Sequence, residues 1–153
     1  MIRLAKITDL HLITPLFREL DAKHIGSNKD VKRVILNKRY KSLFKNVFKK
    51  NSSYILIVNV FEKEIVGFAL GKLLKVENSL IFKNQIIGEI LYLAIQESYK
   101  RKGLGKKMIN EIEKRLKDNG AEKIELRVYS FNKEAIPQKN NYKEKYTTYE
   151  KYL

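Results

Sequence analysis

The chain contains no cysteine and only two histidines, His11 and His24. Without a thiol it has no disulfide, no thiolate metal ligand and no cysteine nucleophile. The two histidines are too few for a histidine-built metal centre, and neither is followed four residues later by a second metal-ligating side chain. We therefore expect no metal site.

Long apolar runs are missing as well. No segment approaches the roughly 20 apolar residues that a bilayer-spanning helix needs. The N-terminal sequence MIRLAKITDLHLITPLF lacks the cationic stretch and long apolar core of a signal peptide. These absences predict a soluble, cytoplasmic protein without a membrane partner.

The composition predicts a folded protein with a strong positive charge. With 153 residues, 44% of them hydrophobic, the chain fits one domain over 1–153 with one core. The formal net charge of +15 attracts anions such as nucleic acid, an acidic membrane face or a polyphosphate cofactor. Because the lysines are scattered among many asparagines and isoleucines, a purely compositional origin of the charge stays equally open.

Hydrophobic periodicity, together with β-branched and aromatic content, divides the chain into helices and strands in the order β-α-α-β-β-β-α-β-α-β. Thr8 or Asp9 can cap the first helix, and Pro15 should kink that helix or mark a later start. The order of elements predicts an α/β fold, a mixed sheet with helices on both faces. The expected strands are 2–6, 54–61, 65–76, 86–95, 124–128 and 143–153; the expected helices are 10–20, 31–48 (one or two), 108–116 (ending at Asn119-Gly120) and 132–139, with a loop at 25–30.

One segment carries the pattern of a ligand site. The apolar strand that ends at Ile95 leads into KRKGLGKK, residues 100–107, where a helix begins. Glycines let the backbone approach a ligand closely, and the first amides of a helix bind phosphate oxygens because they lack intrahelical partners. The spacing therefore predicts an anion cradle at the end of a strand.

Three glycine motifs compete for this segment. A Walker A loop fails because Lys100 stands where its first glycine belongs and Lys107 where it needs serine or threonine. A dinucleotide fingerprint fails at Met108, where its third glycine belongs. The acyl-CoA loop, Gln/Arg-x-x-Gly-x-Gly/Ala, matches at Gly103 and Gly105, with Lys100 in place of glutamine or arginine.

With this loop, several further segments resemble the GNAT superfamily of N-acetyltransferases in the order that the family has them. IRLAKITDLHLI resembles the opening strand and helix, FEKEIVGFALG the central hairpin, and the run from ILYLAI through NKEAI the cofactor-binding region. The resemblance covers nearly the whole chain. It implies a mostly antiparallel, twisted sheet with helices on both faces, and an enzyme that uses acetyl-CoA.

The resemblance also implies which residues bind acetyl-CoA. In the family the cofactor-binding strand splays from its neighbour at a bulge, and the pantetheine arm fills the gap. Asn132 matches an asparagine that often contacts the cofactor. The matching backbone positions are Leu93, Ala94 and Ile95 for the arm, and Lys100, Arg101, Lys102, Gly103, Leu104, Gly105 and Lys106 for the diphosphate.

An acceptor amine must lose a proton before it can attack. An amine with a pKa of about 10.4 is neutral at pH 7 about once in 10³ to 10⁴ molecules, which costs about 4 to 5 kcal/mol. Glu89, six residues before Ile95, resembles the glutamate that serves as base in the histone-acetyltransferase branch. A solvent-facing glutamate at a strand edge is the alternative interpretation.

The C-terminal part departs from the family. Aligned from Tyr142, Pro137 falls where a tyrosine commonly protonates the departing thiolate. Tyr129 and Tyr142 are the candidate substitutes, although packing explains either. An acetyl-CoA-binding sensor or partner without turnover is therefore an alternative function. A nucleic-acid-binding module built on the basic loop and the 31–48 helix is a second alternative, and a homodimer stays open.

Overall fold

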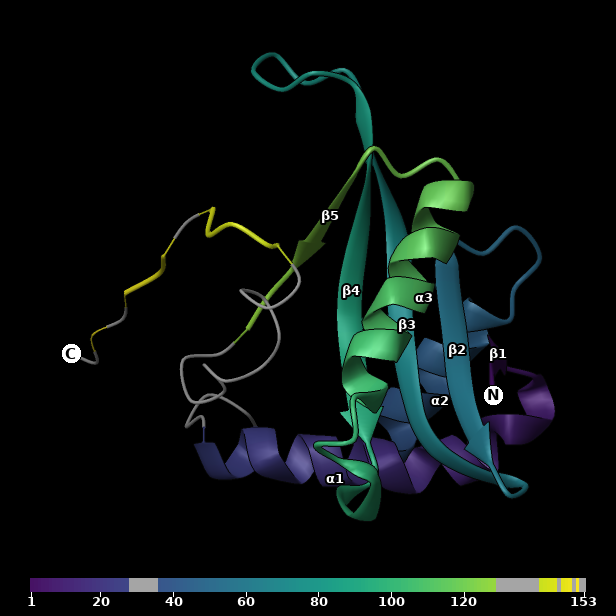
Figure 1. Ribbon diagram of the computed structural model, residues 1–153. Helices are drawn as coiled ribbons and strands as arrows, with labels where there is room; N and C mark the ends of the chain where they lie inside the picture. The colour runs from purple at the N-terminus through teal and green to yellow at the C-terminus, as the bar shows by residue number, and fades with distance from the viewer. Residues whose placement is uncertain (28–35, 129–140, 146, 150, 152–153) are drawn as a thin grey trace.

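The structure is a computed structural model that describes residues 1–27, 36–128, 141–145, 147–149 and 151 (Figure 1). Its centre is a five-stranded sheet in which neighbouring strands are antiparallel, except for the parallel pair β4 and β5. The strands are β1 (Ile2–Leu4), β2 (Tyr54–Phe61), β3 (Glu64–Val76), β4 (Gln85–Ile95) and β5 (Lys123–Leu126), in that spatial order. The expected mixed, mostly antiparallel sheet is confirmed.

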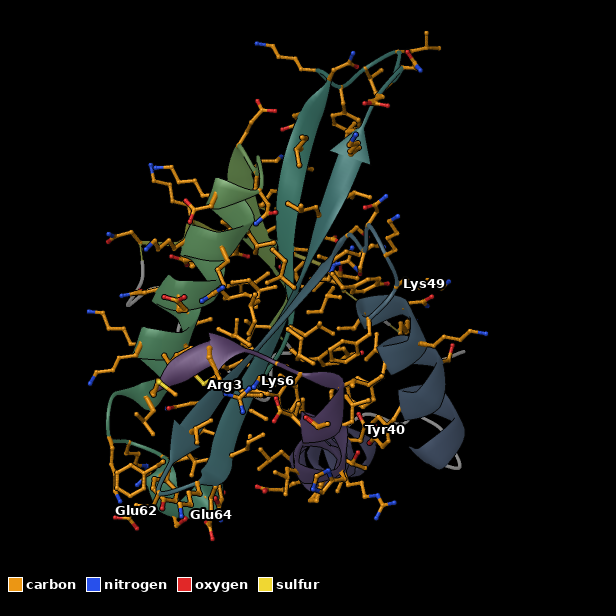
Figure 2. All side chains as sticks on the ribbon, turned by 90° about the vertical axis from the view of Figure 1, so that its right-hand side faces the viewer. Arg3, Lys6, Tyr40, Lys49, Glu62 and Glu64 are labelled. Atoms are coloured by element: carbon orange, nitrogen blue, oxygen red, sulfur yellow. The ribbon has the colours of Figure 1, made fainter. Side chains whose placement is uncertain are left out.

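Helices cover both faces of this sheet. Helices α1 (Leu10–Ser27) and α2 (Leu36–Val47) lie on one face, and α3 (Leu104–Asp118) lies on the other. Figure 2 shows the twisted sheet between these two layers. Two short 3-10 turns, η1 (Ile7–Asp9) and η2 (Glu97–Tyr99), precede α1 and α3.

The strands supply a core on each side because their side chains alternate between the two faces. Val58 and Phe68 pack in the core beneath α1 and α2, whereas their neighbours Ile57 and Ala69 pack in the core beneath α3. Phe17 of α1 is the centre of the first core. Its ring lies 4.4 Å from that of Phe68, and it also contacts the rings of Tyr40, Phe44 and Tyr92.

Helix α3 is fixed on the sheet by one buried stripe. Met108, Ile109, Ile112 and Leu116 recur at helical spacing and are all buried. The helix packs closely, because a Cβ placed on Gly88 of β4 would lie 3.1 Å from the Leu116 side chain and 2.7 Å from Ile124. The helix ends at Asp118, and Gly120 follows with a φ of 97°, which confirms the expected stop at Asn119-Gly120.

The start of the first helix decides one of the two alternatives that Pro15 left open. Helix α1 starts at Leu10 and runs through Pro15, so the alternative of a later start is wrong. Pro15 is exposed, whereas Ile13 and Phe17 on the opposite side are fully buried. Burial of this face outweighs the roughly 3 kcal/mol that an interior proline costs.

Asp9, the last residue of η1, stabilises this turn through its side chain. Its carboxylate accepts a hydrogen bond from the Lys6 backbone amide at 2.7 Å, so Asp9 reaches back over the turn and is not the cap in front of the helix. The same carboxylate binds both terminal nitrogens of Arg3 at 2.7 and 3.0 Å. The Arg3 hydrogen bonds are the main reason that the pKa of Asp9 lies below its usual range. Arg3 and Lys6 are seen beside the start of α1 in Figure 2.

Two other expectations fail in the described part of the chain. Residues 25–27, expected in a loop, form the end of α1, because a glycine in the last helical turn costs only about 1 kcal/mol and does not stop the helix. Residues 143–145, 147–149 and 151, expected in a closing strand, pair with no other strand among the described residues. The expected helical turn at 132–139 lies outside the described residues.

Candidate functional site

Strands β4 and β5 separate halfway along β4. Their parallel pairing runs from Ile87 opposite Lys123 to Ile90 opposite Leu126 and then stops. At the next residue the β3–β4 register shifts, because Gly71 lies opposite Ile90 but Leu70 lies opposite Tyr92. Leu91 is therefore an extra residue, a β-bulge, in the middle of β4. Beyond it, the β5 side of β4 has no partner strand among the described residues.

The bulge changes which side chains of β4 point to which face of the sheet. Before it, the side chain of Ile90 packs beneath α3. After it, Tyr92 and Ala94 pack beneath α1, and Leu93 and Ile95 pack beneath α3. One inserted residue reverses the two-residue alternation. It therefore brings the Tyr92 ring to 5.1 Å from Phe17.

The open edge of β4 offers backbone hydrogen-bonding groups. Gln96 donates its amide to the Val66 carbonyl of β3 at 2.9 Å. Backbone groups of a strand point alternately to its two sides, so the groups of Ala94 face β3, while those of Leu93 and Ile95 face the open edge. An extended acyl or amide-containing chain can pair with this edge as a short additional strand.

The loop after β4 presents amides without partners. Arg101 and Gly103 have φ values of 59° and 77°, and α3 starts at Leu104. The first intrahelical bond at this end runs from the Lys107 amide to the Gly103 carbonyl at 3.2 Å. The backbone amides of residues 101–106 donate to no acceptor within the described part of the chain. Together with the positive end of the helix dipole, they form a cradle for an anion.

The lysines around this loop differ in their surroundings. The Lys100 ammonium forms ion pairs with Glu97 in η2 and with Glu19 of α1, the latter at 3.8 Å, and so connects the loop to α1. The Lys102 ammonium lies 5.2 Å from the centre of the Tyr99 ring. The remaining cations of the loop, Arg101, Lys106 and Lys107, are exposed. Nothing in the sequence pattern indicated the Lys100–Glu19 pair.

Glu89 lies on β4 just before the bulge. It is in register with Lys72 of β3 and Glu125 of β5 and is partly buried. The neighbouring Gly88 faces α3, so Glu89 points to the opposite face, the one that α1 and α2 cover. The structure gives Glu89 no ion pair with any described residue, and the Lys72 ammonium lies 5.4 Å from the centre of the Tyr54 ring.

The neighbouring carboxylate is already engaged. Glu125 accepts a hydrogen bond from Lys145 at 2.7 Å and pairs with Lys123 at 3.0 Å. These two lysines hold the pKa of Glu125 below its usual range, Lys145 contributing most. Of the two adjacent glutamates, Glu125 is therefore held by two lysines, whereas Glu89 has no ion pair with a described residue.

Tyr142 is held by α3. Its hydroxyl donates a hydrogen bond to Glu113 Oε1 at 2.5 Å, and its ring packs against the core beneath that helix. Burial, reinforced by Glu113, raises the pKa of Tyr142 far above its usual range. A phenol held in this way is a poor proton donor. The other expected residues of this region, Tyr129, Asn132 and Pro137, lie outside the described residues.

A hollow in the described part of the chain lies away from the loop of residues 100–107. This hollow of about 510 Å³ opens between the first turns of α1 and the end of α2, and no residue of the 97–107 segment lines it; it is lined by Ile7, Leu10, His11, Thr14, Tyr40, Phe44, Lys45 and Phe48. Within the described ranges, no three histidine, aspartate or glutamate side chains are placed to hold a metal ion, and no helix is long and apolar enough to cross a membrane.

The chain is similar to known acetyltransferases. The model of the acetyltransferase (GNAT) family matches residues 18–137. An acetyltransferase from Vibrio fischeri shares 25% identity over 82% of this chain and 93% of its own, with a TM-score of 0.66. No curated protein sequence matches significantly.

Two further solved structures are alike in fold. A tetramutant of the BH1408 protein from Bacillus halodurans has a TM-score of 0.89 at 21% identity, over 100% of this chain and 99% of its own. Glucosamine-6-phosphate N-acetyltransferase from Arabidopsis thaliana has a TM-score of 0.72 at 18% identity, over 100% and 97%.

Proposed function

The chain belongs to the acetyltransferase (GNAT) family, and we propose that it transfers the acetyl group of acetyl-CoA directly to a primary amine. The observation that carries the proposal combines two features of the described residues: the edge of β4 beyond Ile90 has no partner strand there, and the amides of residues 101–106 have no acceptor there. The first can pair with a pantetheine arm and the second can bind a diphosphate. Bound acetyl-CoA would supply an activated acetyl thioester.

The chain's own groups account for binding. The amides of residues 101–106 donate to the diphosphate oxygens, and exposed Arg101 and Lys106 add electrostatic attraction. The edge amides of Leu93 and Ile95 orient the arm along β4. An edge amide beside the thioester would also donate to the carbonyl oxygen as negative charge develops there.

Glu89 supplies the base. Because it has no ion pair with a described residue, its carboxylate can accept a proton from the acceptor's ammonium, directly or through water. The released amine would then attack the acetyl thioester of bound acetyl-CoA. The C–S bond would break, and the second nitrogen proton would pass to the CoA thiolate, so that the amide and free CoA result. With no cysteine in the chain, no acyl-thiol enzyme can form, so we propose direct transfer in a ternary complex.

Thermal unfolding with acetyl-CoA tests the cofactor part of the proposal. At about 100 times the Kd, a ligand stabilises the folded protein by about 2.7 kcal/mol, which raises Tm by several degrees. S-acetyl-pantetheine, which lacks the diphosphate, is the matched control ligand and should give a much smaller shift. An unchanged Tm with acetyl-CoA would count against the proposal.

A panel of amines tests the transfer itself. Release of free CoA, followed with a thiol reagent, should depend on one class of primary amine. The reagent suits this chain because it has no thiol of its own. Acetyl-CoA binding without turnover on small amines and amine-bearing peptides would instead favour the sensor alternative that Pro137 suggests.

A further inference from the structure

The hairpin of β3 and β4 extends beyond the rest of the sheet as a projecting arm. Pairing with β2 ends at Lys72 opposite Tyr54, and pairing with β5 starts only at Ile87, whereas β3 and β4 pair with each other out to Val76 opposite Gln85. Figure 1 shows the arm leaving the body of the molecule at the end remote from α1. The loop of residues 100–107 follows the other end of β4, so the arm is no part of the proposed cofactor site.

The end of the arm exposes three consecutive apolar side chains, which we call the apolar tip. Leu80 is 102% exposed, Ile81 83% and Phe82 60%. Single exposed apolar residues are common on protein surfaces, but three adjacent ones at the end of a projecting hairpin indicate an interaction site. Hydrophobic burial within this chain does not explain them, because nothing in the described part of the chain covers them.

Side-chain hydrogen bonds to the backbone hold the apolar tip in a defined turn. The Ser79 hydroxyl oxygen accepts hydrogen bonds from the amides of Ile81 and Phe82 at 3.3 and 3.0 Å. Asn84 Oδ1 accepts the amide of Asn78 at 3.2 Å. Backbone amides that enter an apolar medium must be satisfied internally, whereas a loop that meets only water needs no such bonds. Three backbone amides of the turn therefore already have hydrogen-bond acceptors within the turn, as insertion into an apolar medium would require.

The charge around the arm is mainly positive. Lys75 and Lys83 flank the tip, with Glu77 between them. The segments at the base of the arm, the turn before β2 and the end of α3, add more cations than anions: Lys49, Lys50, Lys117 and Lys123 against Asp118 and Glu122. An apolar point on a positively charged end is complementary to an anionic surface.

From these features we infer that the apolar tip inserts into the interface of an anionic lipid bilayer and attaches the protein to its surface. A convex point of three side chains is too small for a stable protein interface, which buries about 800 Å² on each partner. A bilayer requires only that the tip enter it. A second copy of the chain is disfavoured as the occupant, because each copy has a net charge of +15 and the copies repel.

Fluorescence gives a direct test, because the chain has no tryptophan. Phe82→Trp places one reporter at the tip, and Leu12→Trp places one at an exposed site on α1, where Leu12 is 42% exposed. With vesicles of phosphatidylcholine and phosphatidylglycerol, the emission of the tip reporter should shift to the blue and be quenched by brominated acyl chains. The α1 reporter should stay unchanged, and pure phosphatidylcholine vesicles should give a much weaker response.

Co-sedimentation with the same vesicles measures how much the apolar tip and the flanking lysines contribute to binding. Replacing all three tip residues with serine should weaken binding roughly tenfold or more, since the apolar contribution to partition is lost. Leu80→Ser should lower binding and Leu12→Ser, the matched exposed leucine, should not. Lys75→Gln with Lys83→Gln should weaken binding to anionic vesicles and reduce its salt dependence.

Three results would overturn the inference. The first is no binding of the wild-type chain to anionic vesicles. The second is binding that the serine variants leave unchanged, since lysines alone would then hold the protein. The third is self-association that the triple serine variant abolishes in sedimentation velocity, because the tip would then be a protein interface. None of these measurements depends on acetyl-CoA, so the outcome is separate from that of the proposed function.

Discussion

Ile90 of β4 lies opposite Leu126 of β5 in the last residue pair between these two strands, and the bulge at Leu91 follows directly. The two features have one consequence. The bulge turns the rest of β4 by one position, so its apolar side chains fill both cores while its outer backbone groups meet no partner strand among the described residues. Glu89, the proposed base, is two residues before the bulge and therefore lies close to the point where the open edge begins.

Glu89→Gln should reduce turnover by about 10² to 10⁴, the usual contribution of a general base, and leave acetyl-CoA affinity unchanged. The amide cannot accept the proton but has nearly the same size and, in a partly buried position without an ion pair to a described residue, should fold normally. Steady-state kinetics and a thermal shift with acetyl-CoA measure the two effects.

Glu125→Gln is the matched control for this prediction. Glu125 lies beside Glu89 in the parallel register but already binds Lys123 and Lys145. Its replacement should change turnover by no more than a few-fold. Equal losses of turnover in the two variants would remove the reason for assigning the base to Glu89.

Gly103→Ala should lower the free energy of unfolding by roughly 1 kcal/mol and also weaken acetyl-CoA binding. The residue has a φ of 77°, and no atom lies within 4 Å of the added Cβ, so the cost comes from the left-handed backbone and not from a clash. Urea unfolding and calorimetric titration with acetyl-CoA measure the two changes.

Gly120→Ala is the matched control, because it introduces the same kind of backbone strain at a glycine outside the loop of residues 100–107. Its φ is 97°, and an added Cβ would lie 3.5 Å from Ile86. We expect a similar loss of stability but an unchanged Kd for acetyl-CoA, because this glycine follows the opposite end of α3. If both variants left the Kd unchanged, the amides of residues 101–106 would not hold the diphosphate.

Tyr142→Phe should destabilise the protein by roughly 1.5 kcal/mol at neutral pH, because it removes a hydrogen bond to a charged acceptor and leaves the Glu113 carboxylate without it. The folded-state pKa of Tyr142 is raised above about 10, so its stabilisation is present below pH 10 and is lost as the pH rises further. The stability difference between wild type and variant should therefore shrink above pH 10 in urea unfolding.

The same variant separates packing from catalysis. Because the phenol is bound to Glu113, we expect turnover to remain within a few-fold of wild type. A loss of turnover of 10² or more with unchanged acetyl-CoA affinity would instead make Tyr142 the proton donor for the departing thiolate.

Asp9→Asn should lower the free energy of unfolding by roughly 2 kcal/mol, since it breaks a nearly buried ion pair with Arg3. The folded-state pKa of Asp9 is depressed, so its stabilisation is present above about pH 4 and is lost as the pH falls through the folded-state value. The difference from wild type should therefore disappear in acid. Glu64→Gln, at an exposed carboxylate of β3, should change stability little at any pH.

Much of the site was predictable because it depends on local sequence. Tyr54–Phe61 and Glu64–Val76 are specified by their β-branched and aromatic residues. The period-3.6 stripe from Met108 to Leu116 specifies a helix. Gly103 before a helix start indicates an amide cradle, because a left-handed φ and free first-turn amides follow from the chain itself. The Lys100–Glu19 pair was not predictable, since its two residues are 81 positions apart, at 100 and 19.

The sequence by itself therefore determined the order of the elements, the hairpin and the glycine loop, all of which depend on side chains close together along the chain. The tertiary structure decided the rest. Pro15 stays inside α1 because Ile13 and Phe17 are buried against the sheet. Leu91 bulges where the partner strands set the register, and Glu125 rather than Glu89 pairs with lysines among the described residues. Each of these outcomes is set by contacts between distant segments, and no local pattern encodes such contacts.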